Sequence, residues 1–194
     1  DTLLLMDGTY TEGIQNIPSG TSWTSPVIIK AQNQGKAIVR PTTCVGSSVL
    51  KLEGGQSYII IEGLVLDGDN RCPGNLEFRA PGDTDTGQDW HHIRLINNEL
   101  KNAKGAYGGY GSLVGGHNGT MRAYQIEILN NHIHHLGDNL YNHCIYFKAD
   151  DSLIEGNHIH DCAGSGMTFH QSKPGSQANN ITVRNNIVHD LPAG

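Results

Sequence analysis

Histidines recur in this chain two residues apart, which is the spacing at which side chains of a β-strand point to the same side. The segment NNHIHH contains His132 and His134, and GNHIHD contains His158 and His160. Imidazole is a preferred ligand of zinc and copper, so two such pairs on neighbouring strands could hold a metal ion. The same segments could instead be a structural repeat in which histidine has no chemical role.

A second group of residues could act on an acidic sugar. Three short alternating runs, LEFR, IYFK and MTFH, end in the basic residues Arg79, Lys148 and His170. β-Elimination from a uronate needs a group that neutralises the carboxylate, a base that removes the C5 proton and an acid for the leaving oxygen. We assign the carboxylate to Arg79 and expect Lys148, Tyr146, His143 and His170 to divide the base and acid roles.

Lys148 can act as a base near neutral pH only if its pKa is lowered, and we expect its basic neighbours to lower it. Further residues are candidates for contacting the substrate, either on the same outward rows or in the Gly-rich loop from Gly105, where tyrosines could stack on sugar rings. They are Arg79, Glu77, Lys51, Thr168, Tyr107 and Tyr110. Solvated groups on an ordinary strand face and a mobile connector explain the same residues equally well.

An acidic loop, APGDTDTGQDW, offers oxygen ligands for Ca²⁺ through Asp83, Asp85 and Asp89, together with the nearby DGDN segment from Asp67. The spacing matches no defined calcium loop, so a simple acidic loop is the favoured interpretation.

The elements that position these residues follow from a repeat. Four segments align without gaps, namely IRLINNELKN from Ile93, IEILNNHIHH from Ile126, SLIEGNHIHD from Ser152 and ITVRNNIVHD from Ile181. A fifth, IIIEGLVLDG from Ile59, follows the same plan, and we place its Gly63 at the position of Asn98, Asn131, Asn157 and Asn186. A constant motif with variable spacing indicates a fixed coil that carries loops of different length.

Each unit contains a short alternating run, a polar corner and a second short run, and a third run lies between units. This predicts an all-β fold, a single-stranded right-handed parallel β-helix of about six coils with three short strands per coil. We expect residues 1–194 to be one such domain, which could be an excerpt of a longer chain. Inward positions are expected for Val65, Leu100, Ile133, Ile159 and Val188, and in the third runs for Leu76, Phe78, Ile145, Phe147, Met167 and Phe169.

The histidines of HIH then face outward and stack between coils, His132 near His158, and His134 near His160 and His189. Most other coils lack a ligand at these positions, so an exposed structural ladder is favoured over a physiological metal site. Corner asparagines are expected to adopt the left-handed conformation and to bond their equivalents in adjacent coils.

The opening, DTLLLMDGTYTEGI, and the later VLKLEGGQSYIIIEGLVLDG resemble the first coils of pectin-lyase-like right-handed β-helix proteins. The likeness is to the alginate lyase and chondroitinase B group and to β-helix proteins related to mannuronan epimerases. NHCIYFKADDSLIEGNHIHDC is similar to coils found across that superfamily. The resemblance implies a groove along one sheet that receives a polysaccharide, and it makes Ca²⁺ a common helper.

Composition restricts the function further. A net charge of −6 disfavours nucleic acid as a partner, and no apolar stretch approaches the length of a membrane span. The four cysteines show no CxxC spacing, which argues against a structural zinc site, whereas a Cys44–Cys72 disulfide is possible.

We therefore expect a secreted or cell-surface protein, most simply a lyase of an acidic polysaccharide, with no certain cofactor. A non-catalytic binding or structural module is the first alternative. A glycoside hydrolase is the second, and Glu53, Glu77, Asp150 and Asp151 would have to supply its paired carboxylates.

Overall fold

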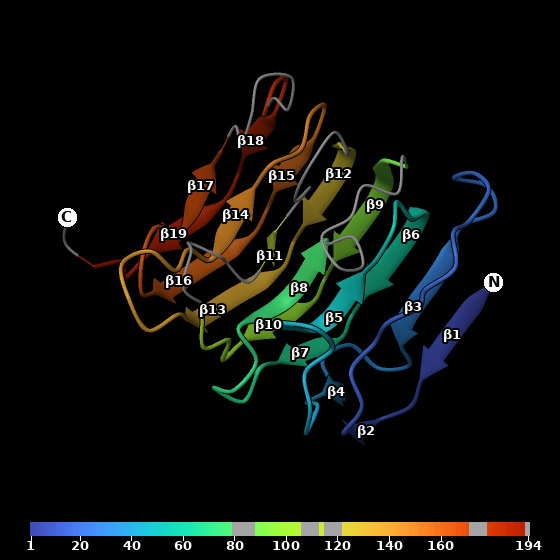
Figure 1. Cartoon of the computed structure of the whole chain (residues 1–194), viewed down its shortest axis with the longest axis horizontal. Coiled ribbons are helices and arrows are strands. Elements are labelled where there is room, and N and C mark those ends of the chain that lie inside the picture. Colours follow the sequence, from blue (N-terminus) through green and yellow to red (C-terminus); the bar gives the residue numbers. More distant parts are fainter. Residues whose placement is uncertain (79–87, 106–112, 115–121, 171–177, 193–194) are drawn as a thin grey trace.

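A computed structural model describes residues 1–78, 88–105, 113–114, 122–170 and 178–192 (Figure 1). Within these residues the chain forms short β-strands and no helix. Accordingly, no described helix has the length and apolar character needed to cross a membrane.

The strands form three parallel sheets along the length of the molecule (Figure 1). The first sheet contains β1 (Thr2–Leu5), β3 (Val27–Ala31), β6 (Ser57–Glu62), β9 (Trp90–Ile96), β12 (Ala123–Leu129), β15 (Leu153–Glu155) and β18 (Thr182–Arg184). The second contains β2 (Gly8–Tyr10), β4 (Ala37–Val39), β7 (Val65–Asp67), β10 (Glu99–Lys101), β13 (His132–Leu136), β16 (His158–Cys162) and β19 (Ile187–His189). The third contains β5 (Ser48–Leu52), β8 (Gly74–Phe78), β11 (Leu113–Val114), β14 (Ile145–Phe147) and β17 (Met167–Phe169).

The chain visits the three sheets in turn, so each strand pairs with its equivalent one coil away. Five coils supply a strand to every sheet, and a two-stranded partial coil lies at each end. This confirms the predicted right-handed parallel β-helix with three short strands per coil.

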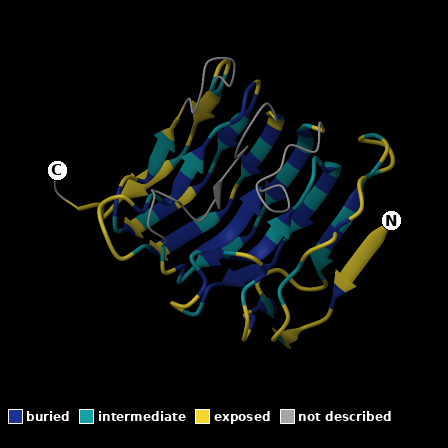
Figure 2. Ribbon diagram, viewed as in Figure 1, coloured by how far each residue is buried: buried dark blue, intermediate teal, exposed yellow. Residues whose placement is uncertain are grey.

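The core is a stack of aliphatic and aromatic side chains inside the coils. Figure 2 shows that the buried residues are concentrated on the strands of the central coils. Because strand side chains alternate, every second residue of each run points inward and meets its equivalent in the next coil. Ile133 pairs in register with Leu100 and Ile159, and all three side chains are fully buried. Phe78 and Phe147 fill the same interior from the third sheet.

The inward column is covered only where another coil lies above it. Val188 is in register with Ile159 as predicted, but it is 38% exposed because β19 is the last described strand of its sheet. Phe169 was expected in the core and is 43% exposed for the same reason in the third sheet, although its ring lies 6.1 Å from that of Phe147.

One predicted alignment was wrong by one residue. Glu99 pairs with Val65 and Leu100 with Leu66, so Gly63 is equivalent to Asn97 and not to Asn98. Val65 therefore occupies an outward position, although it is 2% exposed.

We expected one corner asparagine both to adopt the left-handed conformation and to bond its equivalents in adjacent coils. In the structure these two roles belong to two adjacent corner positions. The first position is left-handed, with φ between 53° and 71°, in Gly63, Asn97, Asn130, Gly156 and Asn185. The second is an asparagine ladder formed by Asn98, Asn131, Asn157 and Asn186, of which the first three are buried. Each ladder side chain accepts a hydrogen bond from the backbone N–H one coil earlier, and the N–H of Asn98 donates to Asn131 Oδ1 at 3.0 Å.

Replacing Asn131 by alanine is expected to lower the free energy of unfolding by about 2–4 kcal/mol, because it leaves the buried N–H of Asn98 and the carbonyl of Leu95 without their partner. Urea unfolding monitored by circular dichroism measures this. Asn139→Ala, in an exposed turn, is the matched control and should cost less than about 1 kcal/mol. Equal losses in the two variants would contradict a stabilising ladder.

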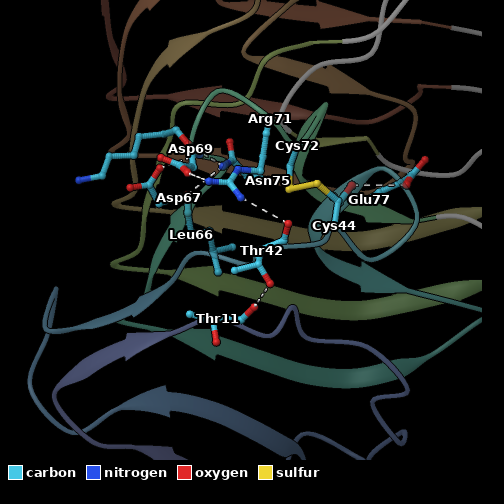
Figure 3. Close-up of a disulfide and its surroundings, with 12 residues drawn as sticks. Thr11, Thr42, Cys44, Leu66, Asp67, Asp69, Arg71, Cys72, Asn75 and Glu77 are labelled. Carbon is cyan, nitrogen blue, oxygen red and sulfur yellow. Dashed lines mark hydrogen bonds and ion pairs between the residues drawn. A yellow bond between two sulfur atoms is a disulfide. The ribbon is translucent and has the colours of Figure 1, made fainter.

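Two disulfides join neighbouring coils. The Cys44–Cys72 bond, which the sequence allowed, links the segments that precede β5 and β8 (Figure 3). Arg71 lies beside it and donates to the carbonyl of Thr42 at 3.4 Å. The Cys144–Cys162 bond was not predicted and links the start of β14 to the end of β16. Two disulfides indicate an oxidising environment of the extracellular kind.

Candidate functional site

Four of the predicted catalytic residues lie together on the outer face of the third sheet. Tyr146 is on β14, and Lys148 follows that strand. The register Tyr146↔Thr168 places Thr168 beside it, and the N–H of His170 donates to the carbonyl of Phe147 at 3.0 Å, which extends the pairing past β17. The alternation that turns Phe147 inward turns its neighbours outward.

Tyr146 is the centre of this cluster. Its ring stacks with that of His143, with centroids 5.8 Å apart, and with that of His170, with centroids 5.4 Å apart. The Nζ atom of Lys148 lies 4.9 Å from the centroid of the same ring. We call His143, Tyr146, Lys148 and His170 the β14 cluster. It places an amine, a phenol and two imidazoles on one face.

Burial shifts the protonation of two members of the β14 cluster. It lowers the pKa of Lys148 below its usual 10.5 and that of His143 below its usual 6.5, because the charged forms lose hydration. Lys148 has the lowered pKa that a base needs. The cause is burial and not the basic neighbours that we had expected.

The tautomer of His143 is set by the turn that follows β16. The N–H of Ser165 donates to His143 Nδ1 at 3.2 Å, so the neutral ring carries its proton on Nε2. The Cys144–Cys162 disulfide joins the residue after His143 to the end of β16, the strand that leads into this turn. Neither contact was predicted from the sequence. The repeat does contain a signal for the disulfide, because it places the two cysteines next to strands of adjacent coils.

At the other end of the same face, the predicted substrate-binding residues already contact other protein side chains. Lys51 pairs in register with Glu77 and forms an ion pair with Glu53. Glu77 is 4% exposed, and its Oε2 accepts from Ser48 Oγ at 3.4 Å. The structure therefore keeps Lys51 and Glu77 in one row but commits them to protein contacts.

Five predicted site residues lie outside the described residues: Arg79, Tyr107, Tyr110, Asp83 and Asp85. Of the proposed calcium ligands, Asp89 is described, and its Oδ1 accepts the N–H of Arg122 at 2.7 Å. In the neighbouring DGDN segment, Asp67 is buried and binds Arg40 at 2.8 Å.

The carboxylates that a hydrolase would need are also paired. Asp150 is buried, binds Arg122 and accepts the N–H of Asn179 at 2.9 Å. Asp151 accepts from the side chain of Asn180 at 2.7 Å at the same corner. These contacts commit both carboxylates to holding the corner together.

A concave surface of about 380 Å³ lies elsewhere, among the turns before β3 and β5, and is lined by Thr11, Glu12, Gln15, Thr42 and Cys44 with their neighbours. It contains no member of the β14 cluster and no basic side chain. We therefore assign no chemistry to it.

The histidines of the HIH segments lie on the second sheet, on a different face from the β14 cluster. The predicted stacking is confirmed, with His132 in register with His158, and His134 with His160. Burial and the neighbouring imidazoles lower the pKa of His132 to about 4, so its ring is neutral at pH 7.

Comparison with known proteins supports this architecture. The family described as right handed beta helix region matches residues 86–194. Among solved structures, the A-module of mannuronan C-5 epimerase AlgE4 from Azotobacter vinelandii is similar, with a TM-score of 0.56 and 14% sequence identity over 98% of this chain. The chain spans 60% of that structure's length. No curated protein sequence matches the chain.

Proposed function

Since the chain belongs to the right-handed β-helix family, we propose that it is an extracellular enzyme that removes the C5 proton of a uronate residue in an acidic polysaccharide. The observation that supports this most directly is the β14 cluster, in which burial lowers the pKa of Lys148 beside the ring of Tyr146. Lys148 is partly buried, and a lysine whose pKa is lowered in this way is a suitable general base.

In the proposed reaction the lone pair of the neutral Lys148 amine takes the C5 proton. The electron pair of the broken C5–H bond forms the C4=C5 double bond as the C4–O4 bond breaks. Tyr146 donates its hydroxyl proton to the departing O4, and Lys148 then returns a proton to the phenolate. His143 donates Nε2–H to the uronate carboxylate, which makes the C5 proton more acidic. Arg79 is assigned to the same carboxylate as a prediction from its sequence position. The products are two shorter chains, one with an unsaturated end.

Epimerisation is the second candidate, because the similar structure is the A-module of a mannuronan C-5 epimerase. It begins with the same removal of the C5 proton but returns a proton to the opposite face of the ring, so the chain is not cut. In that case Tyr146 would protonate C5 instead of O4. The structural likeness at 14% identity supports the scaffold, and the choice between the two outcomes is left to experiment.

A panel of alginate, pectate and glycosaminoglycans distinguishes the alternatives. A lyase makes a conjugated double bond that absorbs in the ultraviolet and shortens the polymer, whereas an epimerase changes the uronate composition without cutting. A hydrolase would produce new reducing ends without absorbance. We expect absorbance with at least one uronate polymer. Binding without any change in the polymer would contradict an enzymatic role and support a binding module.

The lowered pKa of Lys148 makes a prediction for the pH dependence of turnover. The base must be unprotonated, so kcat/KM should rise with pH and level off below pH 10.5, the ordinary lysine value. His143, with a pKa below 6.5, remains neutral across this rise. A rising limb centred at or above pH 10.5 in the measured profile would exclude Lys148 as the base.

A further inference from the structure

A second set of titratable side chains lies on the outer face of the second sheet. Two adjacent columns run across the coils, one through Glu99, His132 and His158 and the other through His134, His160 and His189. We call these six residues the histidine array. The proposed polysaccharide chemistry uses none of them.

The array is built from one diagonal contact repeated at each coil step. Glu99 Oε1 lies 3.1 Å from His134 Nε2, His132 Nε2 lies 2.8 Å from His160 Nε2, and His158 Nε2 lies 2.7 Å from His189 Nε2. In each case the first column bonds to the second column one coil later. In these three contacts the side-chain ligand atoms therefore face one another.

Carboxylates fix the tautomers of two of these rings. Asp161 Oδ2 lies 2.7 Å from His160 Nδ1, and Asp190 Oδ2 lies 2.7 Å from His189 Nδ1. A carboxylate only accepts, so each ring donates Nδ1–H and leaves a lone pair on Nε2. Aspartates that orient an imidazole in this way are typical partners of metal-binding histidines.

The backbone places these aspartates. Asp161 follows His160 and Asp190 follows His189, and both aspartates are left-handed, with φ of 51° and 49°. Asn102 and His135 occupy the equivalent positions with φ of 54°. The left-handed turn brings each aspartate back over the ring that precedes it, so the HD dipeptide of the sequence encodes an oriented imidazole.

We propose that His132, His158 and His160 bind one divalent transition-metal ion of the kind that prefers imidazole, such as Zn²⁺ or Cu²⁺. Their ligand atoms all lie within 4.8 Å of one another. A tetrahedral ion with bonds of about 2.0–2.1 Å holds its nitrogens about 3.3 Å apart, so His132 and His160 need to separate by only about 0.5 Å. His132 and His158 both carry Nε2–H in the array, because each faces the Nε2 lone pair of an aspartate-oriented ring. Either ring therefore coordinates through Nε2 only after its proton has moved to Nδ1.

The overlapping group of Glu99, His132 and His134 is the weaker choice for the same ion. Glu99 is already bound to Lys101 at 2.8 Å, and an ion there would have to displace a protein cation. It would also take His132 away from the three-histidine site, so one ion per chain is expected. The bound ion would join β13 to β16 and hold two coils together from outside, on a different sheet from the β14 cluster.

Titration of the untagged chain with Zn²⁺ by calorimetry, in a buffer that contains excess Mg²⁺, tests the site. We expect one Zn²⁺ per chain and a rise in the melting temperature, since an ion that binds only the folded chain stabilises it. His132→Ala and His160→Ala should each lose this binding. His158→Ala alters the most exposed ligand and keeps the test valid if the other two variants fold poorly.

Asp161→Asn tests the orientation of His160 separately. The amide leaves the three ligands in place but removes the carboxylate, and it should weaken Zn²⁺ binding by about 10–100-fold. His92→Ala removes a histidine of β9 in the first sheet, outside both proposed sites, and should bind Zn²⁺ as the parent does. Absence of Zn²⁺ binding, or binding that survives in a folded His158→Ala variant with unchanged stoichiometry, would overturn the proposal. Neither result bears on the polysaccharide activity, which is measured independently.

Discussion

Replacing Lys148 by alanine is expected to lower the rate of uronate turnover by about two to four orders of magnitude while the protein remains folded. The reason is that Lys148 supplies the proposed base, and burial lowers its pKa and so favours the neutral amine. Its side chain contacts the ring of Tyr146 from outside the core, so its removal leaves the inward columns unchanged. Initial rates on the most reactive polymer, with circular dichroism of the same samples, measure both effects.

Lys148→Arg and Lys30→Ala are the matched controls. Arginine keeps the positive charge but does not lose its proton near neutral pH, so it should be as inactive as alanine if Lys148 is the base. If Lys148 only neutralises the carboxylate, arginine should restore much of the rate. Lys30, on β3 of the first sheet, belongs to no proposed site, and Lys30→Ala should leave the rate unchanged. Parent-like turnover by Lys148→Ala would refute the proposed role.

Replacing Ile159 by aspartate is expected to have the largest effect on stability, more than about 4–5 kcal/mol. Ile159 is fully buried between Ile133 and Val188, where a carboxylate would have neither water nor a partner. Because each coil contacts only its neighbours, the coils around β16 should unfold first. Hydrogen exchange measured by mass spectrometry should show this loss of protection.

The conservative variant Ile159→Val separates charge burial from a general sensitivity of this position. It removes one buried methylene and should cost about 0.5–1.5 kcal/mol. An Ile159→Asp variant with the stability of Ile159→Val would show that this side chain does not lie in the core.

Most of the fold could be predicted from the repeat, because each coil has its own copy of the motif and the same positions recur. Asn98, Asn131, Asn157 and Asn186 could be aligned without gaps, and the structure bonds them to one another in that order. The alignment was wrong at Gly63, because the corner contains two polar positions and this coil has glycine at the first and leucine at the second. A left-handed position and a ladder position look alike in a sequence when both are asparagine.

Strand alternation was enough to predict which residues of the candidate site point outward. Tyr146, Thr168 and their flanking basic residues follow from the inward positions of Phe147 and its equivalents. The burial of Glu77 and the ion pair of Lys51 with Glu53 depend on which side chains pack against the outer face of the third sheet. Strand alternation does not predict those neighbours. The same applies to the Cys144–Cys162 bond and to the N–H that Ser165 directs at His143.

The histidine segments show how one pattern can support two interpretations. The sequence favoured an exposed ladder because the other coils lack histidine at these positions. The structure adds the diagonal contacts and the aspartates that orient His160 and His189, which alternation alone cannot reveal. These contacts are the reason for proposing a metal ion.

Exchange of the C5 hydrogen with solvent tests the central proposal most directly, because elimination and epimerisation share that step. A uronate polymer from the reactive class is incubated in D₂O with the parent and with Lys148→Ala, and deuterium at C5 and loss of the C5 hydrogen are followed by NMR. The parent should release or replace the C5 hydrogen, and Lys148→Ala should not. Retention of every C5 hydrogen by all uronate polymers in the presence of the folded parent would contradict the proposed function.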